Sequence, residues 1–271
     1  MKNGIIYRGK SLIDGKPIVV IATLTKSNVK TTDPNGTGVL QTYILVDGVD
    51  PRLASKTGQD STICGTCIHR GTPTNDPNRK IAVKRSCYVN LGQGVLITYK
   101  AYTRGVYPMA NNAAGRETLG AGRVVRLGTY GDPAAVPSFV WNQLLSNCKS
   151  HLAYTHQIGF RPDIAMQSAD DLEQARALWG QGSRTFRTLN SVSDIDKVNE
   201  ILCPASKEAG QRTTCDSCKL CGGLATKTKK SIAIVLHHAG HRKKKEKLIK
   251  WDSRSIDLLL ERERSRDNEQ R

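Results

Sequence analysis

The architecture of the chain is best predicted from the stretch Val124-Val-Arg-Leu-Gly-Thr-Tyr-Gly-Asp-Pro133. Its first seven residues have the apolar, β-branched character of a buried strand, and the Gly-Asp-Pro sequence after Tyr130 ends that strand sharply. Ser138 then predicts the N-cap of a helix that runs through Leu145 to Cys148. A strand and a helix that alternate in this way are typical of a parallel sheet.

The same alternation continues downstream of Cys148. We expect a helix from about Ala169 to Trp179, which ends at Gly180 and Gly182. The further predicted strands are His151–Tyr154, Ile164–Gln167, Thr185–Leu189, Glu200–Cys203 and Ser231–Leu236. Residues 123–238 therefore predict a parallel α/β domain, whose sheet is either part of a barrel or an open, doubly wound sheet.

The regions on either side of this domain differ from it. Residues 1–122 predict a β-rich region, in which turn sequences such as Asp14-Gly15 and Asp47-Gly48 separate short strands. These predicted strands are Ile5–Tyr7, Pro17–Leu24, Leu40–Val46 and Leu91–Tyr99. Residues 239–271 predict a basic tail that is helical or disordered. The predicted fold class is thus α/β, with a β-rich N-terminal region, a parallel-sheet domain with metal-stapled loops and a basic C-terminal tail.

Polar residues follow the predicted parallel strands. Because such sheets carry their functional groups where the strands end, we expect these residues to share one rim. They are Asp132, His156 with Gln157, Gln167 with Ser168, Cys203, and His237 with His238. Asp132 and His156 are the candidate catalytic residues, although a capping role or a role in the core explains either of them equally well.

The strongest motif is a group of four cysteines, which we call the second cysteine group. Cys215, Cys218 and Cys221 have the spacing C-x2-C-x2-C, and Cys203, followed by Pro204, lies twelve residues before the first of them. Four thiolates can bind one Zn²⁺ ion or hold the four corners of a [4Fe-4S] cluster. Three cysteines within seven residues favour the cluster, and disulfides or unligated thiols are the remaining alternatives.

An earlier set of residues forms the first cysteine group. Cys64 and Cys67 make a C-x2-C knuckle, and Cys87 follows after a polar loop. His69 is a plausible fourth ligand of a zinc ion. A cluster with one iron that lacks a protein ligand would use the same three cysteines. The connecting loop also carries several Lys and Arg residues, so we expect a nucleic acid to contact this region.

Charge is the most extreme property of the composition. Lys and Arg outnumber Asp and Glu by 41 to 24, which gives a formal net charge of +17. Such a charge attracts polyanions, so DNA or RNA is the expected partner, although general basicity or an acidic protein partner is the alternative. The candidate nucleic-acid-binding residues flank the last predicted strand and are Lys227, Lys229, Lys230, Arg242, Lys243, Lys244, Lys245 and Lys247.

Composition also bears on location. No segment approaches the roughly 20 apolar residues of a membrane span, and the N-terminus does not resemble a secretory signal. Eight cysteines in a chain without such a signal favour a reducing cytosol, where clustered cysteines more often bind metal than form disulfides. We therefore expect a cytoplasmic protein that does not enter a membrane; its oligomeric state cannot be predicted.

Several phrases of the sequence resemble a family of cysteine-rich bacteriophage proteins. They include Ile63-Cys-Gly-Thr-Cys-Ile-His-Arg70, Arg126-Leu-Gly-Thr-Tyr-Gly-Asp-Pro133 and the block from Cys203 to Cys221. This resemblance implies a location in the host cytosol during infection but no particular activity. More distantly, three early cysteines before a series of strands, with a later cysteine block, resemble a radical-SAM-like barrel with an auxiliary cluster. The usual spacing there is C-x3-C-x2-C, from which Cys64, Cys67 and Cys87 depart.

Two functions follow as hypotheses. In the first, the protein is a phage metalloprotein, with iron–sulfur or zinc sites, that binds nucleic acid through its basic surfaces and tail. In the second, it is a radical-SAM-like or redox iron–sulfur enzyme that acts on nucleic acid or a nucleotide. The charge favours the first hypothesis, because the catalytic residues are less evident than the basic ones.

Overall fold

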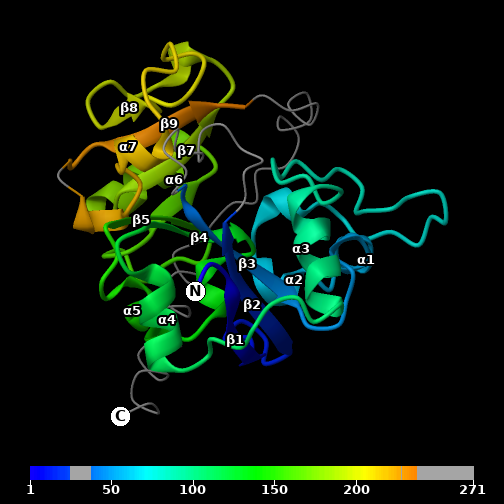
Figure 1. Cartoon of the computed structure of the whole chain (residues 1–271). Coiled ribbons are helices and arrows are strands. Elements are labelled where there is room, and N and C mark those ends of the chain that lie inside the picture. The colour runs from blue at the N-terminus through cyan, green and yellow to red at the C-terminus, as the bar shows by residue number, and fades with distance from the viewer. Residues whose placement is uncertain (25–37, 227, 237–271) are drawn as a thin grey trace.

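A single sheet of nine strands organises the protein (Figure 1). The computed structural model describes residues 1–24, 38–226 and 228–236. Within them the strands lie in the order β1-β2-β3-β4-β5-β6-β7-β9-β8. Their bounds are β1 (Gly4–Lys10), β2 (Pro17–Leu24), β3 (Leu40–Val46), β4 (Val124–Tyr130), β5 (Ser150–Thr155), β6 (Met166–Ala169), β7 (Thr185–Leu189), β8 (Glu200–Leu202) and β9 (Ser231–Val235).

The sheet changes from antiparallel to parallel along the chain. Strands β1, β2 and β3 pair antiparallel, and every neighbouring pair from β3 to β8 is parallel. Among the described residues β1 and β8 are the two ends of the strand order, so the sheet is open and is not closed into a barrel. The predicted α/β class with an N-terminal β-rich region and a following parallel sheet is therefore confirmed.

Strands β3 to β7 lie side by side in chain order. Each parallel neighbour needs a crossover connection, and helices lie in these connections except in that between β5 and β6. The helices are α1 (Pro51–Thr57), α2 (Ser61–Cys64), α3 (Gly94–Thr103), α4 (Ala113–Gly120), α5 (Ser138–Leu145), α6 (Leu172–Gly180) and α7 (Cys215–Cys218). Short 3-10 helices are η2 (Ile68–Arg70), η3 (Pro133–Ala135), η4 (Val192–Asp194) and η5 (Gly223–Ala225).

Strand β3 also pairs with β4, so the sheet is continuous across the predicted boundary at residue 122.

The main core lies between the first strands and the helices that cover them. Helices α1, α2 and α3 contact β3, and α4 packs against α5 (Figure 1). The approach of these last two helices is close, because a Cβ atom at Gly120 would lie 1.8 Å from the carbonyl oxygen of Leu144. Trp141 of α5 is fully buried, and its indole N–H donates to the carbonyl of Pro133 over 2.9 Å. The Gly-Asp-Pro bend after β4 is thereby fixed to α5.

Two local predictions were wrong. Leu91–Tyr99 was predicted as a strand, but Gly94–Thr103 forms α3, which buries Val95, Leu96 and Ala101. A short apolar run with β-branched residues cannot be assigned by periodicity alone, and packing against β3 decides for a helix here. Ser138 is the first residue of α5 rather than its N-cap, which is Pro137. The predicted tail, residues 239–271, lies outside the described residues.

None of the helices in the described segments combines the length and the hydropathy that crossing a membrane requires.

Candidate functional site

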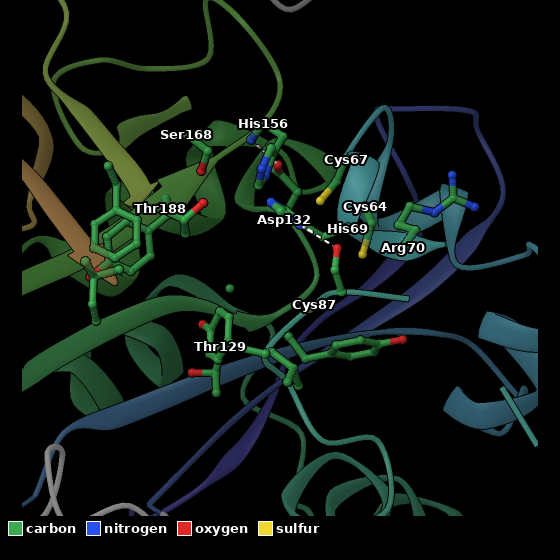
Figure 2. A pocket seen from close by; sticks show the side chains of 18 of the residues that line it. Cys64, Cys67, His69, Arg70, Cys87, Thr129, Asp132, His156, Ser168 and Thr188 are labelled. Carbon is green, nitrogen blue, oxygen red and sulfur yellow. Dashed lines mark hydrogen bonds between the residues drawn. The ribbon is translucent and has the colours of Figure 1, made fainter. Parts of the chain in front are cut away.

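A cavity of about 420 Å³ lies where the parallel strands end. Its walls include residues at or just after the ends of β4, β5, β6, β7 and β9, together with the loop of the first cysteine group. Figure 2 shows Cys64, Cys67 and Cys87 on one side of this space, close to Asp132 and His156. Of the described residues predicted for the rim, Asp132, His156, Ser168 and Cys203 line this cavity together with the first cysteine group, whereas Gln157 and Gln167 do not.

Backbone hydrogen bonds shape the first cysteine group. The amide of Cys67 donates to the carbonyl of Cys64 over 3.1 Å, across a turn in which Gly65 has a φ of +50°. The amide of Cys87 donates to the carbonyl of His69 over 3.0 Å, which brings the distant cysteine back to the knuckle. Burial raises the pKa of the Cys64 thiol well above its usual range, and the neighbouring Cys67 and Cys87 raise it further. A bound cation would offset this cost, because metal binding stabilises the thiolate form.

Two arginines brace this loop from within the protein. Arg70 donates to the Asp60 carboxylate over 2.7 Å and also to the carbonyls of Gly58 and Gly65. Arg85 donates to the carbonyls of Cys87 and Val89 over 3.1 and 2.8 Å. These guanidinium groups, in a loop that we expected to contact nucleic acid, hold the shape of the cysteine loop.

Asp132, a predicted catalytic residue, is fully committed to hydrogen bonds. Its carboxylate accepts from the amide of Ala134 at 3.0 Å, the Thr155 hydroxyl at 2.7 Å and the amide of His156 at 2.7 Å. Its own amide donates to the carbonyl of Ile63 over 2.6 Å. Burial raises the pKa of this carboxyl, although the three donors oppose the rise. Asp132 therefore joins the ends of β4 and β5 to the cysteine loop and acts as a positioning residue.

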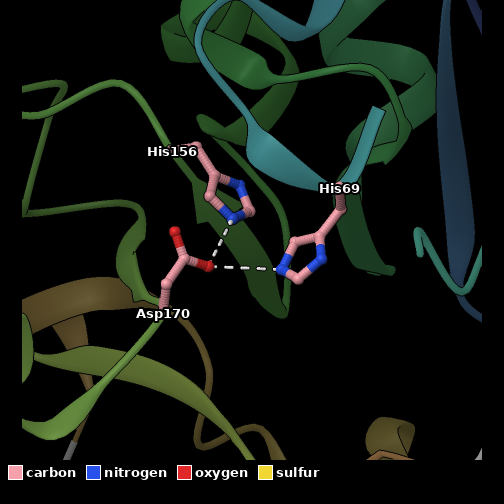
Figure 3. Close-up of side chains that lie close together, drawn as sticks. All are labelled: His69, His156 and Asp170. Atoms are coloured by element: carbon pink, nitrogen blue, oxygen red, sulfur yellow. Dashed lines mark ion pairs between the residues drawn. The ribbon is translucent and has the colours of Figure 1, made fainter. Parts of the chain in front are cut away.

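His156 has a charged partner that the sequence did not reveal. The Nε2 atom of His156 lies 3.8 Å from Oδ1 of Asp170, and Nε2 of His69 lies 3.2 Å from the same oxygen (Figure 3). Burial alone would lower the pKa of His156, but Cys67 and Asp170 beside the ring raise it well above its usual range. Asp170 directly follows β6. The expectation that functional residues follow the ends of parallel strands would therefore have identified it if the end of β6 had been predicted correctly.

His69 is placed differently from the prediction that it joins the cysteines as a ligand. Its Nδ1 atom lies 2.8 Å from the hydroxyl of Ser86, and its Nε2 atom faces Asp170. The imidazole thus contacts Ser86 and Asp170, while its backbone carbonyl holds Cys87. His69 belongs to the same cavity wall as the first cysteine group.

The four cysteines of the second cysteine group surround one small cavity. These residues, Cys203, Cys215, Cys218 and Cys221, line a volume of about 20 Å³. The amide of Ala153 in β5 donates to the carbonyl of Cys221 over 2.9 Å, and the amide of Cys203 donates to the carbonyl of Ala233 in β9. Burial raises the pKa of Cys221 to about 12, although a hydrogen bond with Tyr154 opposes the rise. Cys203 and Cys215 also line the larger cavity, so the two groups lie on either side of it.

Arg126 of β4 lies between the two cysteine groups. Its guanidinium donates to the Tyr88 hydroxyl and lies 5.9 Å from the ring centre of Tyr88 and 5.8 Å from that of Tyr154. Within the described residues its Nε atom, the Thr129 hydroxyl and the Tyr130 hydroxyl are buried without a hydrogen-bond partner. All of these residues line the larger cavity. Buried polar groups without partners are rare in proteins, so these atoms point to a polar ligand.

The spacing of the sulfur atoms bears on which metal the cysteines fit. In the part of the chain that the structure describes, the only set of three or more ligand atoms from His, Cys, Asp or Glu within 4.8 Å of one another is formed by His69, His156 and Asp170. Zinc–sulfur bonds of about 2.3 Å would bring four tetrahedral thiolates to about 3.8 Å from one another. In neither cysteine group do three or more sulfur atoms of the described residues lie that close to one another.

The predicted nucleic-acid-binding residues are only partly described. Lys229 is exposed, whereas the Lys230 ammonium donates to the carbonyls of Lys197 and Val198 and so serves the fold. The remaining predicted residues lie outside the described residues, namely Lys227, Arg242, Lys243, Lys244, Lys245 and Lys247, and the same holds for His237 and His238.

Comparison of the chain with protein-family models, with curated proteins and with solved structures gives no match.

Proposed function

We propose that the protein is a redox or radical iron–sulfur enzyme that acts on a nucleotide, free or within a nucleic acid, bound in the larger cavity. The observation that carries this proposal is that Cys64, Cys67 and Cys87 line the same cavity as Arg126, Thr129 and Tyr130, which carry buried polar atoms without a hydrogen-bond partner among the described residues. In this proposal Cys64, Cys67 and Cys87 would hold a [4Fe-4S] cluster in which one iron lacks a protein ligand, and the cluster would supply one-electron redox chemistry beside the cavity.

The residues of the chain bind and orient the substrate. Arg126 neutralises a phosphate, and its buried, unpaired Nε atom adds a hydrogen bond to that group. Tyr88 and Tyr154 flank Arg126 with aromatic rings on which a base can stack. The hydroxyls of Thr129 and Tyr130 supply further hydrogen bonds. The cavity is large enough for a ligand of this size, since small-molecule sites span roughly 300–1,000 Å³.

The test is a metal analysis of protein purified without oxygen. We expect a brown protein with about eight iron and eight sulfide ions per chain, because two [4Fe-4S] clusters hold four of each. The Cys64→Ser variant should lose about half of both, and Cys148→Ser, at a cysteine outside both groups, should lose none. A colourless wild-type protein that contains only zinc would refute the proposal.

A second candidate function is the binding of DNA or RNA by electrostatic attraction. The observation that favours it is the net charge of +17. The exposed Lys229 and the basic residues beyond residue 236 would contribute to such binding. Filter binding of single-stranded and double-stranded nucleic acid at several salt concentrations tests it. An affinity that falls linearly with salt on logarithmic axes is expected, and the absence of any binding at low salt would contradict it.

A further inference from the structure

Three side chains at one wall of the larger cavity direct ligand atoms at a common point. The Nε2 atoms of His69 and His156 lie 3.2 and 3.8 Å from Oδ1 of Asp170, and all three atoms lie within 4.8 Å of one another. Figure 3 shows both imidazole rings turned toward the same carboxylate oxygen. Metal–nitrogen and metal–oxygen bonds of about 2.0–2.2 Å around one ion place its ligands about 3–3.5 Å apart. Small movements of the three side chains would meet that spacing.

Hydrogen bonds among the three residues explain the arrangement incompletely. The distance of 3.8 Å between His156 and Asp170 is longer than a hydrogen bond. The contact of His69 with Ser86, at 2.8 Å, allows the Nδ1–H group to donate to the hydroxyl. In that tautomer the Nε2 atom of His69 carries a lone pair toward Asp170 and can bind a metal ion; in the other tautomer Nε2–H donates to Asp170 over 3.2 Å.

Each of the three residues is also held in place by a second contact. Ser86 fixes the ring of His69, and the Asp132 carboxylate accepts the amide of His156 over 2.7 Å. The amide of Asp170 donates to the side chain of Gln174 over 2.7 Å. Of these contacts, that of the His69 ring with Ser86 is of the kind typical of metal sites, where a histidine ligand donates its other ring N–H to a neighbouring oxygen.

We propose that His69, His156 and Asp170 bind one divalent transition-metal ion, zinc or iron(II), at a site that uses no cysteine ligand and lies in the same cavity wall as the first cysteine group. Two histidines and one carboxylate form the ligand set of mononuclear iron(II) enzymes and of catalytic zinc sites. Three protein ligands leave coordination positions for a water molecule or for a ligand in the cavity, which all three residues line. This inference stands independently of the iron–sulfur proposal.

Cobalt(II) is a suitable probe. It can take the place of zinc, which has no absorption of this kind, and its d–d absorption reports binding at nitrogen and oxygen ligands. The full-length protein, loaded at its cysteine sites and freed of loosely bound metal by gel filtration, is titrated with cobalt(II). The variants are His69→Gln, Asp170→Asn and the milder Ser86→Ala. The matched control is Asp163→Asn, an exposed carboxylate whose partner is Arg161.

We expect the wild type and the control variant to bind about one cobalt ion per chain with equal affinity. The affinity should fall at least about tenfold in Ser86→Ala, since loss of an outer contact of a metal ligand costs roughly 10–100-fold, and further in the two ligand variants. Circular dichroism shows whether the ligand variants are folded. If they are not, the cobalt affinity of Ser86→Ala tests the inference. No cobalt bound to the wild type, or unchanged affinity in Ser86→Ala and Asp170→Asn, would overturn the inference. Iron and sulfide content report separately on the cysteine sites, so failure of one proposal is distinguishable from failure of the other.

Discussion

The two cysteine groups differ in the number of thiols and in the space beside them. The first group offers three thiols beside a cavity of about 420 Å³; the second offers four around a cavity of about 20 Å³, and two of these, Cys203 and Cys215, also line the larger cavity. Metal sites with a full set of protein ligands are usually structural, and sites with a missing ligand are usually catalytic. If both groups bind metal as proposed, substrate chemistry would belong to the first group and a structural or electron-transfer role to the second.

The groups also differ in what holds their loops. The first loop is braced by Arg70 and Arg85 through bonds to Asp60 and to backbone carbonyls. The second group contributes directly to the core, since Cys221 is buried with Val124, Leu152, Met166 and Ile232. Loss of metal should consequently destabilise the protein more at the second group than at the first.

The largest effect on stability is expected from Cys221→Ser. This variant removes one metal ligand from a buried site and leaves a polar hydroxyl in its place. Loss of such a site costs several kcal/mol, so the melting temperature should fall by about 10 °C or more, at roughly 2–4 °C per kcal/mol. Differential scanning fluorimetry without oxygen measures the change, with Cys148→Ser as the control. A fall of less than about 3 °C would contradict the structural role of the second group.

A smaller effect on stability is expected from Cys87→Ser in the first group. The variant should lose about half of the iron, but its melting temperature should change by no more than about 3 °C, since the arginine contacts remain. Metal analysis and the same fluorimetry provide both values. If Cys87→Ser and Cys221→Ser lowered the melting temperature equally, the two groups would not differ in the way proposed.

Arg126→Gln tests whether the cavity beside the first group binds an anion. Removal of a buried cation that bonds a phosphate costs roughly 1.5–3 kcal/mol, so a nucleoside 5′-monophosphate should bind about tenfold more weakly or worse. Equilibrium dialysis with adenosine and guanosine monophosphate measures the affinity. Arg176→Gln, at an exposed arginine of α6, is the control. Equal affinities for the variant, the control and the wild type would remove Arg126 from the site.

The smallest effect on either cysteine group is expected from removal of residues 242–271. This deletion leaves all eight cysteines in the chain, so metal content and melting temperature should not change. It should flatten the dependence of nucleic-acid affinity on salt by about 0.9 units of slope for each phosphate of duplex DNA that the tail neutralises. Filter binding at several salt concentrations decides this. An unchanged slope would show that the tail does not bind nucleic acid.

Much of the sheet could be predicted because its strands are short apolar runs bounded by turn residues. Strands β2, β3, β4 and β7 have the bounds that the sequence predicted. Helix α3 was missed, because Val95 to Tyr99 has the composition of a strand and its burial depends on the partner it packs against. The continuity of β3 with β4 likewise depends on pairing between residues far apart in the chain.

The candidate site could be predicted only in part. Asp132 and His156 could be predicted because they closely follow β4 and β5. The hydrogen bonds that Asp132 accepts from Thr155 and His156, however, could not be predicted, and they make it a positioning residue. Asp170 was missed because the sequence predicted that β6 ends two residues too early and that a helix begins at about Ala169. Arg126 could not be identified from the sequence near it. It became a candidate only because the described residues give it no carboxylate partner and place two tyrosines beside it.

The proposed difference between the first cysteine group, with three thiols, and the second, with four, can be tested by electron paramagnetic resonance. The reduced protein is measured with and without a nucleoside monophosphate. The account predicts two cluster signals, of which the nucleotide shifts one, and Cys87→Ser should abolish that same signal. The signal that depends on Cys221 should be unchanged by the nucleotide. Two signals that both ignore the nucleotide, or a shift confined to the signal that Cys221→Ser abolishes, would contradict the account.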